Sequence, residues 1–158
     1  MTGPAVEIQS EARRQIGELA AESKDGRETG GILLGRGPGA YGVITIERAG
    51  DPGPKAERRA DYFLRDLAHA KQLADAAWQE NEAVWIGEWH THPTGLKRPS
   101  PRDLVTYSGL LADPELSFDA FVSIIVVPDP DWLTPRLLTW ILGSTEGRET
   151  LGGEGADR

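Results

Sequence analysis

Two histidines, a serine and an aspartate lie within one short stretch of the chain, GEWHTHPTGLKRPSPRD, at residues 87–103. His90 and His92 are separated by one position, so in a strand both side chains project from the same face. Two neutral imidazoles and one carboxylate form the ligand set of many catalytic zinc sites, where water takes the remaining position. The stretch is therefore compatible with a metal site formed by His90, His92 and Asp103.

The same residues also have a purely structural interpretation. Ser100 is a favoured N-cap, Pro101 suits the first helical position, and Asp103 completes a pattern typical of a capping box. The loop from Pro93 is long enough to bring Asp103 back towards the histidines. From the residues alone, a metal site and a capped helix after a strand both stay open. We expect metal binding by Asp103 to compete with a hydrogen bond to the N-cap amide.

Composition restricts the other chemistries. The 158 residues include no cysteine, which excludes disulfides, thiolate nucleophiles and cysteine-bound zinc. No apolar run is long enough to span a bilayer, and the first residues lack the apolar core of a signal peptide. The net charge of −8 argues against a nucleic-acid partner and favours a basic protein partner. We expect a cytoplasmic protein without nucleic-acid or membrane partners.

Apolar periodicity predicts the elements that must position these residues. The pattern indicates an α/β domain over residues 1–143 with a central mixed sheet flanked by helices. A flexible, solvated insertion at 50–60 and a flexible polar tail at 144–158 are also expected. The predicted helices are 9–23, 62–79 and 101–111, and the predicted strands are 30–35, 43–50, 82–92, 118–128 and 132–143.

The order of the chemistry-bearing residues resembles the JAMM motif of the JAB/MPN metalloprotease family. That motif has a glutamate, then H-x-H, ten residues and an aspartate, often within S-x-x-D; His90, His92, Ser100 and Asp103 match it. The upstream glutamate is Glu28, which leads into the segment ETGGILLG. The resemblance spans residues 10–142 and looks most like prokaryotic JAB proteins. It implies a single MPN/JAB domain with a cytidine-deaminase-like architecture.

The resemblance also implies an activity, that of a zinc metallopeptidase. His90, His92 and Asp103 would hold Zn²⁺, while Glu28 would take a proton from water and return it to the leaving amine. Ser100 would donate a hydrogen bond to the oxyanion. The implied reaction is hydrolysis of the amide or isopeptide bond after the C-terminal tail of a ubiquitin-like protein. Activating and conjugating enzymes of the same pathway are the further partners implied.

Glu88 departs from the usual family pattern. It lies two residues before His90, on the same strand face by simple alternation. Either it orients an imidazole or it is an exposed residue without a role. Motif position favours Glu28 over Glu88 as the base. Trp89, if exposed, would be able to contact substrate.

Other functions match parts of the pattern. Non-haem iron oxygenases also use two histidines and a carboxylate, but a fold of many strands would be expected for them. A zinc nucleobase deaminase would need a P-C-x-x-C pair, and the chain has no cysteine. A non-catalytic MPN-type scaffold and a small-substrate amidase of sulfur-carrier pathways both stay open as alternatives.

Overall fold

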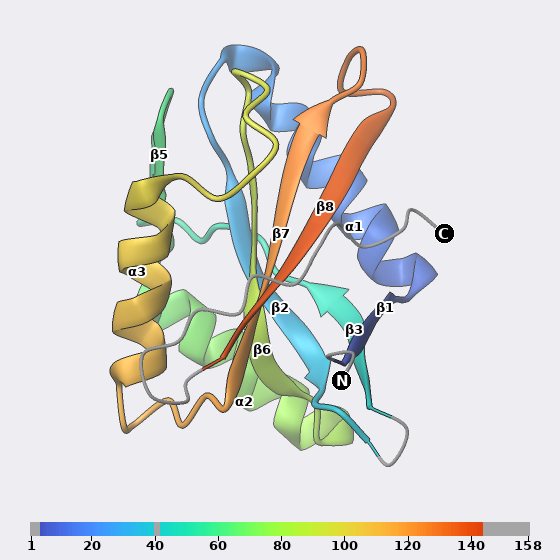
Figure 1. The fold of residues 1–158 in the computed structure, drawn as a ribbon, viewed down its shortest axis with the longest axis vertical. Helices are drawn as coiled ribbons and strands as arrows, with labels where there is room; N and C mark the ends of the chain where they lie inside the picture. The colour runs from blue at the N-terminus through green and yellow to red at the C-terminus, as the bar shows by residue number, and fades with distance from the viewer. Residues whose placement is uncertain (1–3, 40–41, 144–158) are drawn as a thin grey trace.

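A six-stranded mixed sheet forms the centre of the computed structural model, which describes residues 4–39 and 42–143 (Figure 1). The strand order is β1-β3-β2-β6-β7-β8; β1 runs parallel to β3 and β6 parallel to β7, and the other pairs are antiparallel. A separate hairpin joins β4 and β5. The strands are β1 (Ala5–Ile8), β2 (Gly30–Arg36), β3 (Val43–Ala49), β4 (Glu57–Arg59), β5 (Tyr62–Leu64), β6 (Val84–Thr91), β7 (Ala120–Pro128) and β8 (Pro135–Gly143).

Helices cover both faces of the sheet (Figure 1). Helix α1 (Ser10–Ala20), followed by the 3₁₀ helix η1 (Ala21–Asp25), packs Ile16 into the core on one face. Helices α2 (Leu67–Asn81) and α3 (Pro101–Ala112) pack on the other face, where α3 buries Tyr107. The central strands are almost wholly buried because both of their faces are covered. The predicted fold class, a mixed α/β domain with a central mixed sheet flanked by helices, is confirmed.

The predicted start of the second helix is wrong. Residues Tyr62–Leu64 form strand β5, and α2 begins only at Leu67. Asp66 is the N-cap, and its carboxylate accepts a hydrogen bond from the backbone N–H of His69 at 3.1 Å. Phe63 matches the helical spacing in the sequence, but its side chain is buried by strand alternation instead.

Two further differences concern short strands. Residues 57–59 of the predicted flexible insertion form β4, which pairs with β5, and Arg58 within it forms an ion pair with Asp25 at 2.9 Å. Strand β1 was not predicted, since its four residues carry only a brief, half-buried alternation. The predicted tail at 144–158 lies outside the described residues. Within the described ranges, no helix has the length and apolar character needed to cross a membrane.

Candidate metal centre

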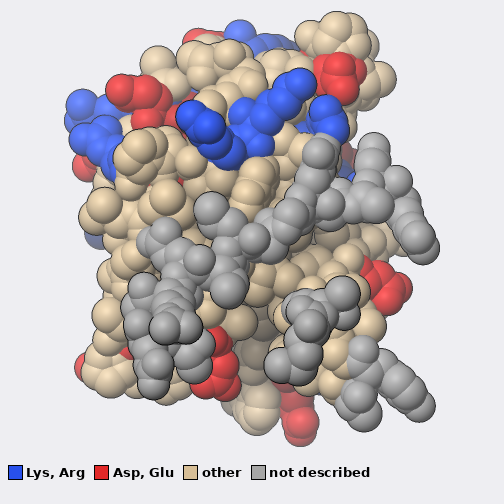
Figure 2. Space-filling view, viewed as in Figure 1, with Lys and Arg blue, Asp and Glu red and all other residues tan. Residues whose placement is uncertain are grey.

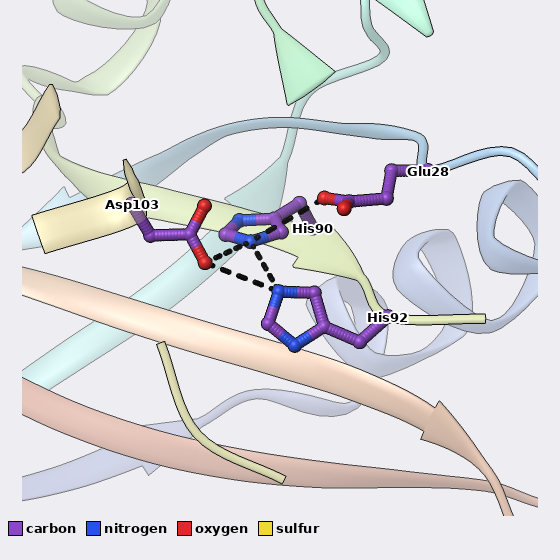
Figure 3. A group of neighbouring side chains, drawn as sticks. All are labelled: Glu28, His90, His92 and Asp103. Atoms are coloured by element: carbon purple, nitrogen blue, oxygen red, sulfur yellow. Dashed lines mark hydrogen bonds and ion pairs between the residues drawn. The ribbon is translucent and has the colours of Figure 1, made fainter. Parts of the chain in front are cut away.

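Four side chains singled out from the sequence converge at one end of β6 (Figure 3). They are Glu28, just before β2; His90 and His92, at and beyond the end of β6; and Asp103, in the first turn of α3. One ligand atom from each lies within 4.8 Å of the others. The two histidine Nε2 atoms are 3.0 Å apart, and each lies 3.1 Å from Oδ2 of Asp103.

The register between β2 and β6 brings Glu28 to the histidines. Gly30 is paired with His90, and a Cβ atom at Gly30 would lie 2.2 Å from a β6 carbonyl oxygen, so the approach requires glycine. Thr91 points to the opposite face, as predicted, where its Oγ1 accepts the Thr29 N–H at 2.8 Å. The Thr91 N–H donates to the Thr29 carbonyl, also at 2.8 Å. These bonds fix the backbone next to Glu28 against the end of β6.

Asp103 takes part in two arrangements that the sequence suggested would compete. Its Oδ2 accepts the backbone N–H of Ser100 at 2.8 Å, and its own N–H donates to Ser100 Oγ at 3.1 Å. The same Oδ2 faces both histidines. One carboxylate oxygen offers lone pairs in both directions, and the competition expected on metal binding stays a prediction. The capping box holds Asp103 in the position that faces the histidines.

The donor set fits a cation held by nitrogen and oxygen. Nδ1 of His92 lies 2.8 Å from the Leu96 carbonyl, which only accepts, so Nδ1 carries the proton and Nε2 presents its lone pair. Two Nε2 atoms and one carboxylate oxygen then face one another at about 3 Å, an arrangement that needs a proton or a cation between them. Oε1 of Glu28 is buried beside them without a hydrogen-bond partner among the described residues. Nitrogen and carboxylate ligands of this kind suit zinc.

The carboxyl groups of the cluster have opposite electrostatic environments. Burial raises the pKa of Glu28 to about 8, although the nearby His90 acts in the other direction. Burial also acts to raise the pKa of Asp103, but hydrogen bonds with His90 and His92 outweigh it and hold that pKa well below its usual range. Without a metal, the cluster therefore favours an ionised Asp103 beside a Glu28 that can carry a proton near neutral pH. Such a split suits an acid–base role for Glu28.

Glu88 and Glu28 approach His90 from different sides. Oε1 of Glu28 lies 3.8 Å from Nε2, the atom that faces His92 and Asp103. Oε1 of Glu88 lies 3.7 Å from Nδ1, on the other edge of the ring. The interpretation of Glu88 as an exposed residue is wrong, because it is 2% exposed and forms an ion pair with Arg65.

The structure also places two other residues singled out from the sequence, Trp89 and Ser100. Trp89 is fully buried and its Nε1 donates to the Gly50 carbonyl at 3.0 Å, so the substrate-contact hypothesis for this tryptophan is wrong. Ser100 lies at the N-cap of α3, where its Oγ accepts the Asp103 amide. No described residue accepts the proton of that hydroxyl. It is therefore free to be donated.

Three residues near His90 were missed by sequence reasoning. The Tyr107 hydroxyl lies 3.3 Å from Nδ1 of His90, and Ser123 Oγ donates to that hydroxyl at 2.9 Å. Arg65 pairs with Glu88 immediately behind them. The only sequence signal was a charged residue following the apolar run YFL, which sequence periodicity alone cannot connect to β6.

The end of the molecule that carries the cluster exposes cationic side chains (Figure 2). Lys97 and Arg98 lie exposed in the loop between β6 and α3, directly after the Leu96 carbonyl that faces His92. Arg102 is also exposed, and its guanidinium lies 4.4 Å from the centre of the Tyr62 ring. Cationic side chains are thus exposed near the cluster although the net charge is acidic.

Comparison with known proteins decides the family. A model of a family described as prokaryotic homologs of the JAB domain matches residues 10–143. The chain belongs to the prokaryotic JAB family. The resemblance predicted from the JAMM-like residues is therefore confirmed.

Relatives of this prokaryotic JAB chain share one name, CD-NTase/cGAS isopeptidase. The protein from Escherichia coli (strain TW11681) is 30% identical over 84% of this chain and 82% of its own length. Those from Enterobacter hormaechei subsp. hoffmannii and Pseudomonas aeruginosa are 30% and 33% identical over 65% and 54% of this chain. The chain spans only 57% and 54% of the length of these two relatives.

Solved structures show the same fold at lower identity. A protein from Desulfitobacterium hafniense superimposes with a TM-score of 0.63 and 19% identity, covering 87% of this chain and 84% of that one. A protein from Salinibacter ruber gives 0.54 and 20%, covering 96% and 99%. At these identities the likeness concerns the fold alone.

Proposed function

We propose that this prokaryotic JAB protein is a cytoplasmic zinc-dependent isopeptidase or peptidase. Its substrate is the amide or isopeptide bond after the C-terminal tail of a ubiquitin-like protein. The observation that carries the proposal is the convergence of Glu28, His90, His92 and Asp103 within 4.8 Å. The name isopeptidase, shared by three relatives, supports the reaction class.

In this proposal, His90, His92 and Asp103 hold the zinc ion. Nε2 of each histidine and Oδ2 of Asp103 face one another, and the three atoms come from a strand end and a capped helix. When bound, zinc supplies Lewis acidity and can lower the pKa of water from about 15.7 to about 7. The fixed tautomer of His92, with Nδ1–H donated to the Leu96 carbonyl, keeps its Nε2 available as a ligand.

Glu28 and Ser100 act on protons and developing charge. Glu28 accepts a proton from the attacking water and later delivers it to the leaving amine, and its buried Oε1, which has no hydrogen-bond partner in the described part of the chain, is suited to this. Ser100 uses a lone pair to cap α3 and donates its free O–H to the oxyanion of the tetrahedral intermediate. Glu28 is the base in preference to Glu88 because it lies on the Nε2 side of His90.

The reaction class named for the relatives supports the substrate assignment. Cleavage of an isopeptide bond presupposes a conjugate, so a ubiquitin-like protein and its activating and conjugating enzymes are the proposed partners. A non-catalytic scaffold is disfavoured because this chain retains every expected donor together with Glu28. A small-substrate amidase would use the same residues, and substrate assays separate it from the isopeptidase.

The first test is metal content by elemental analysis of wild type, His92→Ala and Glu28→Ala. We expect about one zinc per chain in wild type, because His90, His92 and Asp103 together form one three-ligand site. His92→Ala should lose this zinc and Glu28→Ala should keep it. Failure of the wild-type apoprotein to take up zinc would overturn the hydrolase mechanism and favour the scaffold.

The second test is cleavage of linear and isopeptide-linked ubiquitin-like fusions, with a small amide substrate alongside. Wild type should release the ubiquitin-like protein, and zinc-loaded Glu28→Ala should not. Turnover of the small amide alone would contradict the isopeptidase assignment and support the amidase.

A further inference from the structure

A buried ion pair lies directly behind the candidate metal centre. Glu88, on β6, is 2% exposed and Arg65, just after β5, is 7% exposed. The Arg65 guanidinium binds Oε2 of Glu88, which leaves Oε1 directed at Nδ1 of His90, 3.7 Å away. One carboxylate oxygen of Glu88 thus contacts Arg65, and the other faces the imidazole of His90.

Stability alone does not explain such a pair. Taking two charges out of water costs so much that a buried ion pair is often no more stable than apolar side chains of similar volume. The core cluster that includes Trp85 and Phe121 is built of apolar and aromatic side chains. The one direct contact of Glu88 with the metal centre is its approach to His90. A role in orienting that imidazole accounts for the charge.

Two groups that face Nδ1 of His90, the Tyr107 hydroxyl and the Glu88 carboxylate, favour different tautomers of the ring. The ring stacks on Phe63 with an interplanar angle of 22°, so it is held in one plane. Tyr107, whose hydroxyl receives a hydrogen bond from Ser123, lies 3.3 Å from Nδ1 and can either donate to it or accept from it. Donation by Tyr107 would leave the ring proton on Nε2 and remove the lone pair that faces Asp103.

The negative charge of Glu88 decides this competition. A carboxylate oxygen that faces Nδ1 favours a proton on that nitrogen, and a protonated Nδ1 cannot accept from Tyr107. Nε2 is left with its lone pair directed at His92 and Asp103. Arg65 holds the carboxylate in place and balances its charge.

We propose that Glu88, held by Arg65, is a positioning residue that keeps the proton of His90 on Nδ1 and directs Nε2 at the metal position. This rests on the proposed function, in which Nε2 of His90 is a zinc ligand. Partners of this kind commonly change metal affinity by about 10–100-fold. Arg65, which follows the β4–β5 hairpin, thereby contributes to metal binding without supplying a ligand.

The experiment measures zinc affinity by competition with a chromophoric chelator, together with the melting temperature of each apoprotein. Glu88→Gln keeps the shape of the side chain, but its amide can donate to Nδ1 and favour the wrong tautomer. Its zinc affinity should fall by about 10–100-fold. Phe118→Leu is the matched control, because Phe118 packs on Trp85 and Phe121 away from His90. This control should lower the melting temperature and leave zinc affinity unchanged.

Each outcome decides the proposal. Unchanged zinc affinity in Glu88→Gln overturns it, and so does an equal loss in Phe118→Leu at equal melting temperature. If Glu88→Gln does not fold because Arg65 is left unpaired, the double variant Glu88→Gln with Arg65→Met removes both charges and is judged by the same criteria. Wild type that binds no zinc would overturn the proposed function itself, whereas wild type and Glu88→Gln that bind zinc equally would overturn only the positioning role.

Discussion

Substitution of Ser100 separates helix capping from the proposed donation to the oxyanion. Ser100 Oγ accepts the Asp103 amide at 3.1 Å and caps α3, while its hydroxyl proton has no acceptor among the described residues. Both Ser100→Ala and Ser100→Gly remove the hydroxyl. They differ in capping, because glycine is tolerated at an N-cap and alanine is not. Ser100→Thr keeps both the cap and the hydroxyl.

The two roles predict different magnitudes. Loss of the cap should lower the free energy of unfolding by about 1 kcal/mol in Ser100→Ala and by only a few tenths in Ser100→Gly. With a total stability of about 5–15 kcal/mol, either variant stays folded at assay temperature. Loss of an oxyanion donor should lower kcat by about 10²–10³-fold, or about 2.7–4 kcal/mol, in both variants equally.

The assay pairs urea unfolding with steady-state cleavage of a ubiquitin-like fusion, each on zinc-loaded protein. We expect kcat to fall to the same extent in Ser100→Ala and Ser100→Gly, with zinc content unchanged, while Ser100→Thr keeps most of the wild-type kcat. A Ser100→Gly variant with wild-type kcat would refute the donor role. So would a kcat that follows stability across the series, since capping alone would then explain the effect.

Four other outcomes follow from the structure. Arg58→Ala should lower kcat but not zinc content, because Arg58 Nε donates a hydrogen bond to the backbone carbonyl of Glu28, the proposed base, at 3.0 Å. Metal analysis and cleavage assays check this. The Arg27 amide and the Arg58 guanidinium hold the pKa of Asp25 below its usual range. The stabilisation from Asp25 is therefore present above the unfolded-state pKa and is lost as pH falls through the folded-state value, so acid unfolding should be less steep in Asp25→Asn. Gly30→Ala should destabilise the protein by about 1–3 kcal/mol through overpacking against β6 and weaken zinc binding. Gly37→Ala is the control, because nothing lies within 4 Å of the new Cβ. In thermal melts and chelator competition it should change neither stability nor zinc binding. Removal of zinc by a chelator should lower the melting temperature, since zinc at about 1,000 times its Kd contributes about 4 kcal/mol; a melting temperature independent of zinc would contradict the ligand assignment.

The sequence by itself determined the features that depend on near neighbours in the chain. Alternation along a strand placed His90 and His92 on one face with Thr91 on the other, and the order of Ser100, Pro101 and Asp103 predicted the start of α3 and its capping box. These features follow from backbone geometry over a few residues. The same local rules also failed at β5, where Phe63 matched helical spacing but pairs as part of a strand.

Tertiary structure decided everything that joins distant segments. Pairing of Gly30 with His90 brings Glu28 to the histidines, through contacts such as that between Thr29 and Thr91, 62 positions apart. The sequence associated Glu28 with the site only through its family resemblance. The pairing of Arg65 with Glu88 could not be predicted from the sequence, because strand register and the packing of one layer on another arise only when separate elements bury their apolar faces together.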